Sequence, residues 1–463
     1  MTSYRPTRRN LLKQAGVAGA AAATTGITLA SIPNVVRAQD NTVRFYVRGD
    51  EAIFAVFDRL KEAFREVEPD LEVEIEEAPG DEWHNEFMLK VASDDAPDCL
   101  FECDCTITSS IRAGALEPLD EYLAGDERFN RENYLDIAWN ASEFEGATYG
   151  LPYDGGSMAL FYNKTLFEEA GVEPLDPVTP VSWEELIEIG KRLTKDRGGK
   201  RADEDGFDSG RILQFGISPT TWMPYTWIWG NGGEALTAEG QVVLAEPAAV
   251  AGMQFLADLN LVHHVAPSPQ TGDTTTISFQ TGNVAMEYNG VWSMVRYREL
   301  DFDWDVAPFP TGQVPVSTGW YSPLSISSGA RNKEGAWKWI SFCCSEPGQR
   351  IVAELGQAVP PVRALAESEV FLNPNNLPEH KQVFLDQLNP EILRTVGDTY
   401  GTYFGGYRLE WGQIFTPLFE EVLRGDRTAE EVAPEIQEKL QNLLDTGEMS
   451  DSPDDLVHRH QQG

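Results

Sequence analysis

The stretch that decides the fold is VRFYVRGDEAIFAVFDRLKEAFREVEPDLEVEI, residues 43–75. It opens with the apolar run of residues 43–47, which is typical of a buried strand. Apolar residues then recur on one face of a helix, and apolar and acidic residues alternate from Leu71 to Ile75. The helical face consists of Ile53, Phe57, Leu60, Phe64 and Val67. This order predicts two parallel strands with the helix packed on their sheet.

The alternation of strands and helices continues along the chain, so we expect an α/β protein. A chain of 463 residues exceeds one compact core, and two lobes, each with a mainly parallel sheet flanked by helices, are the natural arrangement. The segment 149–156 contains Pro152 and the pair Gly155-Gly156, and we expect it to interrupt regular structure and form a hinge. Further expected elements are a strand at 99–103, a strand at 158–162, a helix opened by the capping box Ser182-Trp183-Glu184-Glu185, and elements at 246–261, 284–288 and 291–298.

The N-terminus reads as an export signal. Residues 7–13, TRRNLLK, resemble the twin-arginine motif, and an uncharged stretch rich in Ala, Gly and Thr follows up to Ala38. We expect residues 1–38 to be removed on export to the periplasm or the cell exterior. No later segment reads as membrane-spanning, so no insertion into the membrane is expected.

The charge excludes one class of partner. The full chain carries a formal charge of −38, and removing residues 1–38, with five basic and no acidic residues, leaves −43. Nucleic acid and anionic membrane surfaces would repel such a chain. We expect the acidic tail, residues 451–463, to be flexible because it is too polar to pack.

The cysteines are expected to be reduced. There are five of them, and the twin-arginine route carries proteins that fold in a reducing cytoplasm. Cys103 and Cys105 have no nearby histidine and lack the ligand spacing of a zinc site. We therefore expect small buried thiols, with neither a metal nor a cofactor.

Three aspartates are placed at the expected crevice. Ligands of open parallel sheets bind beyond the carboxyl ends of strands. Asp50 follows the first strand and Asp104 the third, so both should face one crevice. Asp154 lies in the expected hinge and is a weaker candidate.

Aromatic residues cluster where the pattern predicts loops. An indole or phenol ring stacks on the C–H face of a sugar, while carboxylates, amides and arginines serve its hydroxyls. For any single ring, core packing is an equal alternative. The clusters are Trp222, Tyr225, Trp227 and Trp229; Tyr288 and Trp292; Trp320 and Tyr321; and Tyr400, Tyr403, Tyr407 and Trp411.

An ordered set of motifs spans most of the chain after residue 38. It resembles the family 1 extracellular solute-binding proteins of ABC importers, whose members take mono- and oligosaccharides, glycerophosphates and other polyols. The most specific piece is residues 279–292, FQTGNVAMEYNGVW. The other pieces are Ala96-Pro97-Asp98, residues 150–153 and 160–172, residues 182–186, Gly319-Trp320, residues 332–337 and residues 345–349.

The resemblance implies a type II periplasmic-binding-protein fold with three hinge crossings. The crossings would fall near Asp154, near Pro310 and near Val359-Pro360-Pro361. Lobe 1 would then comprise residues 39–153 and 311–359, and lobe 2 residues 154–310 and 360–450. The turn at Asn289-Gly290 would lie at the crevice and bring Asn289 and Trp292 to the ligand.

We therefore expect a monomeric binding protein that closes over a sugar and delivers it to an ABC importer permease. A neutral sugar is favoured over a phosphate because few lysines or arginines lie near the predicted loops. Arg363 could donate to a hydroxyl or a phosphate, or form a surface ion pair. Stacking is assigned to Trp292, Trp320 and Trp411, with Trp83, Trp229 and Tyr321 behind them.

The alternatives are a secreted carbohydrate hydrolase, a binding protein for glycerophosphates or polyols, and a surface adhesion protein. A hydrolase would share the aromatic platforms and carboxylates. However, the chain lacks a His-Glu-x-x-His motif, a phosphate loop and a nucleophile elbow, since Gly155-Gly156-Ser157-Met158-Ala159 has no final glycine. We therefore do not expect an enzyme.

Overall fold

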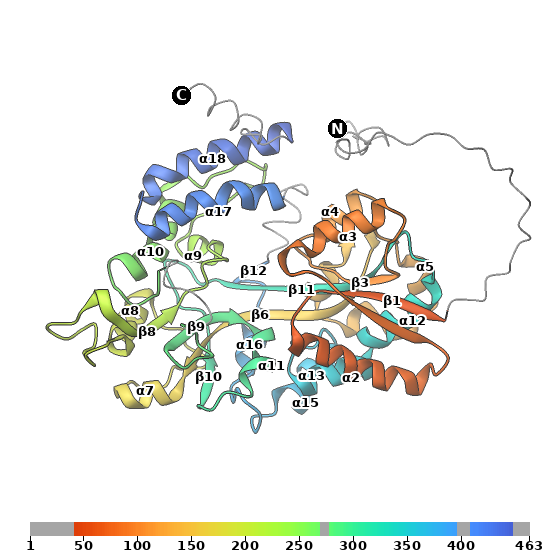
Figure 1. Ribbon diagram of the computed structural model, residues 1–463, viewed down its shortest axis with the longest axis horizontal. Coiled ribbons are helices and arrows are strands. Elements are labelled where there is room, and N and C mark those ends of the chain that lie inside the picture. Colours follow the sequence, from red (N-terminus) through yellow and green to blue (C-terminus); the bar gives the residue numbers. More distant parts are fainter. Residues whose placement is uncertain (1–40, 269–276, 396–407, 448–463) are drawn as a thin grey trace, which may run out of the picture. The chain divides into compact units, whose positions relative to one another are not determined.

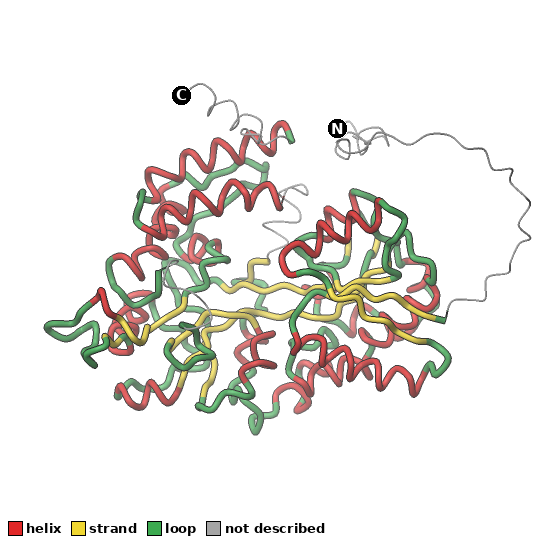
Figure 2. The backbone as a smooth tube through the Cα atoms, viewed as in Figure 1, coloured by secondary structure: helices red, strands yellow, loops and turns green. Residues whose placement is uncertain are grey.

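The computed structural model describes residues 41–268, 277–395 and 408–447. The expected signal peptide, the tail at 451–463, and the tyrosines at 400, 403 and 407 lie outside the described residues. Ribbon and backbone views are given in Figures 1 and 2.

The opening strand–helix–strand unit forms as predicted. Strand β1 (Thr42–Val47) pairs in parallel with β2 (Glu72–Glu77), and α2 (Glu51–Val67) connects them. The Asp50 side chain caps α2 by accepting from the backbone N–H of Ile53 at 3.3 Å. The apolar face of α2 is buried up to Phe64, whereas Val67, at the last position of the helix, is exposed.

The other helices and strands follow along the chain, singly or in runs of helices. In the first part they are α3 (Trp83–Ala92), β3 (Cys99–Phe101), α4 (Ile107–Arg112), α5 (Asp120–Leu123), α6 (Asp136–Asn140), β4 (Glu143–Phe144), β5 (Ala147–Thr148), β6 (Leu151–Asn163), α7 (Lys164–Ala170), α8 (Trp183–Leu193), β7 (Lys195–Asp196), β8 (Ile212–Ser218), α9 (Tyr225–Gly230) and α10 (Pro247–Leu261). They continue with β9 (Val284–Gly290), α11 (Met294–Tyr297), β10 (Trp304–Ala307), β11 (Ser317–Ile326), α12 (Lys333–Cys344), α13 (Glu346–Leu355), α14 (Arg363–Ala366), α15 (Glu369–Leu372), α16 (Gln382–Asp386), β12 (Leu393–Thr395), α17 (Arg408–Arg424) and α18 (Ala429–Thr446).

Ten of the described strands form one sheet with helices on both of its faces (Figure 2), while β4 and β5 form a separate two-stranded sheet. The strand order of the larger sheet is β2-β1-β3-β11-β6-β9-β8-β7, with β10 beside β6 and β12 beside β11. The sheet is mixed rather than mainly parallel, because β6 runs antiparallel to β9, β10 and β11, and β11 runs antiparallel to β3. The opening unit contains only parallel neighbours, so its pattern carries no sign of these distant antiparallel partners.

The segment expected to break regular structure is instead part of the longest strand. β6 runs without interruption through Pro152, Gly155 and Gly156 and lies beside β11 (Figure 1). The glycines serve close packing, since a Cβ at Gly155 would overlap the Trp320 carbonyl oxygen. The prediction of a break was therefore wrong, because Gly155 permits close contact between two strands, while Gly156 lies against Val359 and Val291.

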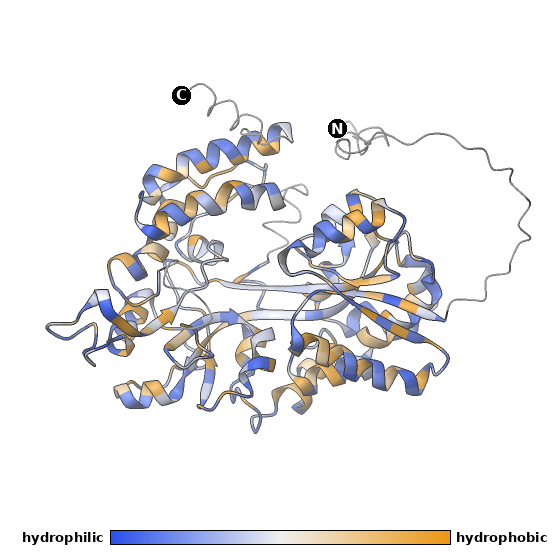
Figure 3. Cartoon of the chain, in the orientation of Figure 1, coloured by the Kyte–Doolittle hydropathy of each residue, from blue (hydrophilic) through white to orange (hydrophobic). Residues whose placement is uncertain are grey.

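The hydrophobic interior has two large parts. The first core lies around β1, α2, β3, α12 and α13, and the second core around α8, α9, α10, β9, α17 and α18. β6 contributes its early residues, such as Tyr153, to the first core and later ones, such as Leu160, to the second. Figure 3 shows the helices of both regions carrying hydrophobic and hydrophilic residues together, as expected for helices with one buried face. None of the described helices is long and apolar enough to cross a membrane.

Four rings from aromatic clusters predicted to lie in loops, Tyr225, Trp227, Trp229 and Trp411, lie on helices and are buried instead. All six residues of α9 are buried, including Trp229. Trp411 lies on α17, is 1% exposed, and donates its indole N–H to the Tyr225 hydroxyl at 2.7 Å. The alternation of apolar rings with Thr and Gly resembled a loop, but these rings fill the second core.

We predict that Trp411→Ala lowers the free energy of unfolding by about 3–5 kcal/mol, the usual cost of removing a buried aromatic ring. Urea denaturation followed by circular dichroism measures this change. Trp222→Ala serves as the control because its ring is 56% exposed, and its effect should stay within about 0.5 kcal/mol. Equal effects of the two substitutions would contradict the burial of Trp411.

Candidate functional site

A cavity of about 330 Å³, here named the central cavity, lies beside the paired strands β6 and β11 between the two cores. Its lining residues come from the first half of the fold around β1 and β3, from β6 and β11 themselves, and from the second half around β9. The residues are Arg48, Gly49, Ile53, Phe101, Cys103, Asp104 and Cys105; Asp154, Gly155, Trp320 and Ser322; and Trp222, Met223, Trp292 and Arg296. Four of the residues predicted from the sequence meet here: Asp104, Asp154, Trp292 and Trp320.

Three tryptophans form a row along the central cavity. The ring centroids of Trp292 and Trp320 are 4.7 Å apart, and those of Trp222 and Trp320 are 6.1 Å apart. A Cβ at Gly290 would overlap the Trp292 indole, so this glycine lets the ring fold back over the strand end. Trp222 was noted only as a member of an aromatic cluster. Its neighbours in that cluster are buried, and the sequence held no sign that this ring alone is exposed.

Two arginines line the central cavity beside the carboxylates. Arg48 follows β1, donates to the Glu102 carbonyl at 3.2 Å and to the Ser322 hydroxyl at 2.9 Å, and lies 4.4 Å from the Phe101 ring centroid. Arg296 lies on α11. Few cations were expected near the site, and the lining contains these two. Neither was named from the sequence, since Arg48 lies just after β1 and Arg296 on a short helix.

Asp154 is a cavity carboxylate whose pKa is shifted by its surroundings. The residue is 8% exposed, and its carboxylate accepts from the Gln357 amide at 2.9 Å. Burial raises its pKa from 3.8 to about 6, against the opposing effects of the Gln357 hydrogen bond and the charges of Arg48 and Arg296. At neutral pH the group is therefore largely ionised but close to its titration range.

Asp50 has a different role from the one predicted. It caps α2 and forms an ion pair with Arg296, with Nε to Oδ2 at 2.6 Å, and it is not among the residues that line the central cavity. The ion pair connects the β1–α2 turn to α11, 246 positions further along the chain. The carboxylate thus orients a cavity arginine.

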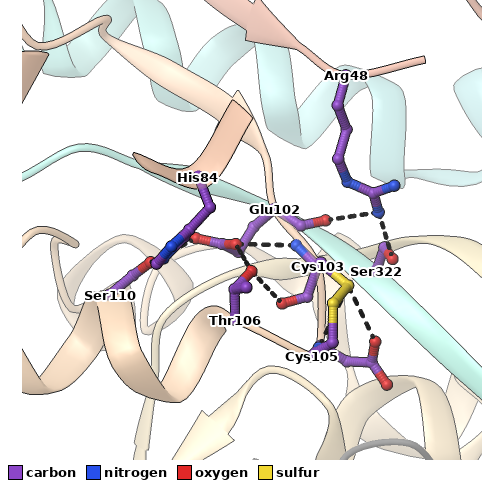
Figure 4. Close-up of a disulfide and its surroundings, with 9 residues drawn as sticks. Arg48, His84, Glu102, Cys103, Cys105, Thr106, Ser110 and Ser322 are labelled. Atoms are coloured by element: carbon purple, nitrogen blue, oxygen red, sulfur yellow. Dashed lines mark hydrogen bonds between the residues drawn. A yellow bond between two sulfur atoms is a disulfide. The ribbon is translucent and has the colours of Figure 1, made fainter. Parts of the chain in front are cut away.

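Asp104 lies between the two cysteines that were expected to be free. Cys103 and Cys105 form a disulfide, which corrects the expectation of five reduced thiols, while Cys99, Cys343 and Cys344 are free and buried (Figure 4). The aspartate carboxylate contacts the Cys103 sulfur at 3.5 Å. The disulfide was not predicted because two cysteines separated by one residue can pair only if the chain turns between them. The strand had been predicted to continue to Cys103, whereas β3 ends at Phe101.

A second cavity, of about 550 Å³, shares Asp104 and Trp320 with the central cavity. α4, α6, the start of α14 and β12 supply most of its other residues. Arg363 lines it and donates to the Tyr134 carbonyl at 2.9 Å, and Tyr321 lines it with a fully buried ring whose hydroxyl donates to the Val359 carbonyl at 3.2 Å. Arg363 thus faces a cavity and donates to a backbone carbonyl.

The remaining predicted residues do not line either cavity. Trp83 packs in a small cluster with Tyr46 and Phe87, and Trp229 and Trp411 lie in the second core. Asn289 pairs with Ala159 at the end of β9, and its side-chain oxygen accepts from the Gly290 N–H at 2.8 Å. The turn predicted at Asn289-Gly290 is therefore the end of a strand.

Among the described residues, two groups could offer three ligands to a metal ion: Cys103, Asp104 and Cys105, and Asp305, Glu379 and His380. In the first group the sulfurs are bonded to each other and offer no thiolate. In the second, Asp305 already accepts from the His380 ring nitrogen at 2.7 Å and from the Val306 N–H at 2.9 Å. Neither arrangement points to a metal.

An α/β fold whose main cavity is lined by aromatic and charged residues is typical of a protein that binds a small polar molecule. The family profile described as bacterial extracellular solute-binding protein matches residues 48–350, and the chain belongs to this family. The matched range includes every residue that lines the central cavity.

Individual relatives are distant in sequence. The maltotriose-binding protein of Pyrococcus abyssi is 24% identical over 298 residues, which cover 63% of this chain and 60% of that protein. The chain thus spans about three fifths of that relative. The sn-glycerol-3-phosphate-binding periplasmic protein of Agrobacterium fabrum is 30% identical over 162 residues, 32% of this chain and 33% of that protein.

Solved structures establish the fold. A substrate-binding protein of an ABC transporter from Listeria monocytogenes, in complex with cycloalternan, superposes with a TM-score of 0.75 at 20% identity, covering 87% of this chain and 99% of that one. A maltose-bound protein of T. maritima gives 0.72 at 22% identity, with the same coverage. The expected α/β periplasmic-binding-protein fold is confirmed.

We predict that Asp50→Ala destabilises the protein more than Asp50→Asn does, by about 0.5–1 kcal/mol. Asparagine retains the oxygen that caps α2, whereas alanine loses it, and both lose the charge beside Arg296. Urea denaturation of the two variants measures the difference. If they are equally stable, the cap does not explain the position of Asp50.

A pH dependence follows from Asp154. Its pKa is higher in the folded protein, about 6, than its ordinary value of 3.8, so the folded state binds this proton more tightly. The contribution of Asp154 to stability therefore falls as pH rises from about 4 to about 6, by up to about 3 kcal/mol, and then stays constant. Asp154→Asn should remove this slope and gain stability relative to the native protein between pH 4 and pH 7.

Denaturation at both pH values, compared with Asp301→Asn, measures the effect. Asp301 is exposed, so this control should keep the native pH dependence. An Asp154→Asn variant with an unchanged slope would show that the Asp154 carboxyl is not buried as described.

Proposed function

We propose that this protein captures a sugar in the central cavity and presents it to the permease of an ABC importer. The row formed by Trp222, Trp320 and Trp292 beside carboxylates and arginines carries the proposal. Membership of the solute-binding family supports it, as do relatives named for maltotriose and arabinooligosaccharide binding.

The chemistry of the cavity suits a pyranose. Its C–H face can stack on the indole rings, and its hydroxyls can donate to Asp104 and Asp154 and accept from Arg48. A volume of about 330 Å³ lies within the usual range of roughly 300–1,000 Å³ for small-molecule sites.

Closure about a hinge is the proposed mechanism. Lobe 1 would comprise residues 39–153 and 311–359, and lobe 2 residues 154–310 and 360–450. The chain would cross between them near Asp154 in β6, near Pro310 ahead of β11, and near Val359-Pro360-Pro361. Because Arg48 and Asp104 come from one half and Trp222, Trp292 and Arg296 from the other, closure would bring both sets onto the ligand and expel water.

Export and assembly complete the proposal. Residues 1–38 would direct the chain through the twin-arginine route, and a monomer would release its ligand to the permease outside the cytoplasm. Delivery requires no change in the ligand, so we propose no catalysis.

Two observations favour alternative functions, a binding protein for a phosphate-bearing polyol and a hydrolase. Arg48 and Arg296, with the relative named for sn-glycerol 3-phosphate, favour a phosphate-bearing polyol as the second candidate ligand. The raised pKa of Asp154 is a property that a hydrolase requires of its general acid.

A thermal-shift screen separates these functions. The chain from residue 39 onward is mixed with maltose, maltotriose, arabinooligosaccharide, lactose, polyols and sn-glycerol 3-phosphate. A ligand of the native state raises the melting temperature, and chromatography shows whether it is recovered intact. A shift only with sn-glycerol 3-phosphate would replace the sugar proposal, consumption of the ligand would indicate a hydrolase, and no shift would contradict all three.

Calorimetry of Trp292→Ala places the ligand. Truncating a stacking ring should weaken the affinity for the sugar identified in the screen by at least about tenfold. Trp337→Ala is the matched control, since this ring stacks on Tyr122 at 5.1 Å, away from both cavities. The control should bind as the native protein does, and equal affinity of the two variants would remove the tryptophan row from the site.

A further inference from the structure

We propose that the Cys103–Cys105 disulfide holds the Asp104 carboxylate in the ligand site, so that ligand affinity depends on the redox state of this cysteine pair. The inference rests on the proposed function, because it concerns the affinity of the same site. It begins with the loop that leaves β3 and enters α4.

Glu102 fixes this loop from inside. Its carboxylate is fully buried and accepts from the Cys103 N–H at 2.9 Å, the Thr106 hydroxyl at 2.7 Å and the Ser110 hydroxyl at 2.8 Å (Figure 4). The Cys103 carbonyl in turn accepts from the Ile107 N–H at 2.9 Å, at the start of α4. Both ends of the loop are therefore anchored.

The disulfide restrains what lies between these anchors. It closes Cys103, Asp104 and Cys105 into a small covalent ring, and all three line the central cavity. Asp104 also lines the second cavity, so this residue is shared by both. When the bond is cut, the sulfurs must move apart and the ring residues regain backbone freedom, which shifts the carboxylate that the ring presents.

The disulfide also lies where the two halves of the protein meet. The loop leaves from β3, in the first half, yet Cys105 packs in the second core. Cys103 packs against both the second core and the small cluster around Trp83. Displacement of these sulfurs would therefore disturb the contact between the halves as well as Asp104.

The chemistry is confined to this pair among the cysteines. A dithiol such as dithiothreitol supplies two electrons and two protons, becomes a cyclic disulfide itself, and leaves Cys103 and Cys105 as thiols. Cys99, Cys343 and Cys344 are fully buried, and burial raises the pKa of each thiol, so they are poor partners for exchange. Cys103 and Cys105, by contrast, both line the central cavity.

Reduction and ligand binding must then affect each other equally. If the oxidised protein binds ligand more tightly by some factor, bound ligand opposes reduction by the same factor. A disulfide that only stabilises the fold would change neither the ligand affinity on reduction nor the ease of reduction on ligand binding.

The test compares oxidised protein with protein reduced by dithiothreitol, using maltotriose as the probe in calorimetry. Reduction should weaken affinity by at least about fivefold, the lower end of usual coupling between sites. The Cys103→Ser/Cys105→Ser double variant should bind as weakly as the reduced protein and should not respond to dithiothreitol. Equal affinity of oxidised and reduced protein would overturn the proposal.

Two further measurements assign the cause. Hydrogen exchange at the amides of residues 103–107 needs no ligand and should accelerate on reduction, while the thermal transition shows that the fold persists. In Asp104→Asn, reduction should have a smaller effect on affinity than in the native protein, because the group that the ring positions has been changed. Unchanged exchange, or an undiminished redox effect in Asp104→Asn, would overturn the positioning role.

A failure of the proposed sugar binding gives a different result from a failure of the redox proposal. If the oxidised protein binds neither maltotriose nor any other sugar of the screen, the sugar proposal is wrong, and with it the coupling of affinity to redox state. The exchange measurement still decides whether the disulfide holds the loop.

Discussion

The close approach of β6 to β11 at Gly155 is the contact on which both cores and the ligand site depend. Any Cβ at this position would overlap the backbone of β11 at Trp320. With hydrogen only, the two strands pair from Leu151 to Ser157, and β6 then continues into the second half to pair with β9 and β10. The same short crossing places Asp154 and Trp320 on the wall of the central cavity. The absence of a side chain at Gly155 thus permits both the continuous sheet and the geometry of the site.

Local patterns predicted the elements well. The capping box at Ser182 forms with both of its hydrogen bonds, α10 begins one residue after its expected start, and β9 contains the strand expected at 284–288. Periodicity and caps act within a few residues, so they can be read from the sequence alone. The strand directions could not be read in this way, because β6 and β11 acquire their neighbours from distant parts of the chain.

The site was predictable where it follows from strand ends or from the family motif. Asp104 and Trp292 were located in this manner, and both line the central cavity. Trp411 was misplaced because a ligand-stacking indole and a core indole have the same local sequence preferences. The pairing of Asp50 with Arg296 spans 246 positions, and no local signal reports it.

The place of β11 in the sheet also affects how the chain is made. β3 lies between β1 and β11, and its Phe101 is paired with Leu324. During synthesis this edge of β3 has no native partner until β11 leaves the ribosome, a delay on the order of 10–45 s at roughly 5–20 residues per second. An unpaired apolar edge is a template for aggregation in that interval. The nascent chain therefore has a long period of vulnerability, in which chaperones would have their greatest effect on yield.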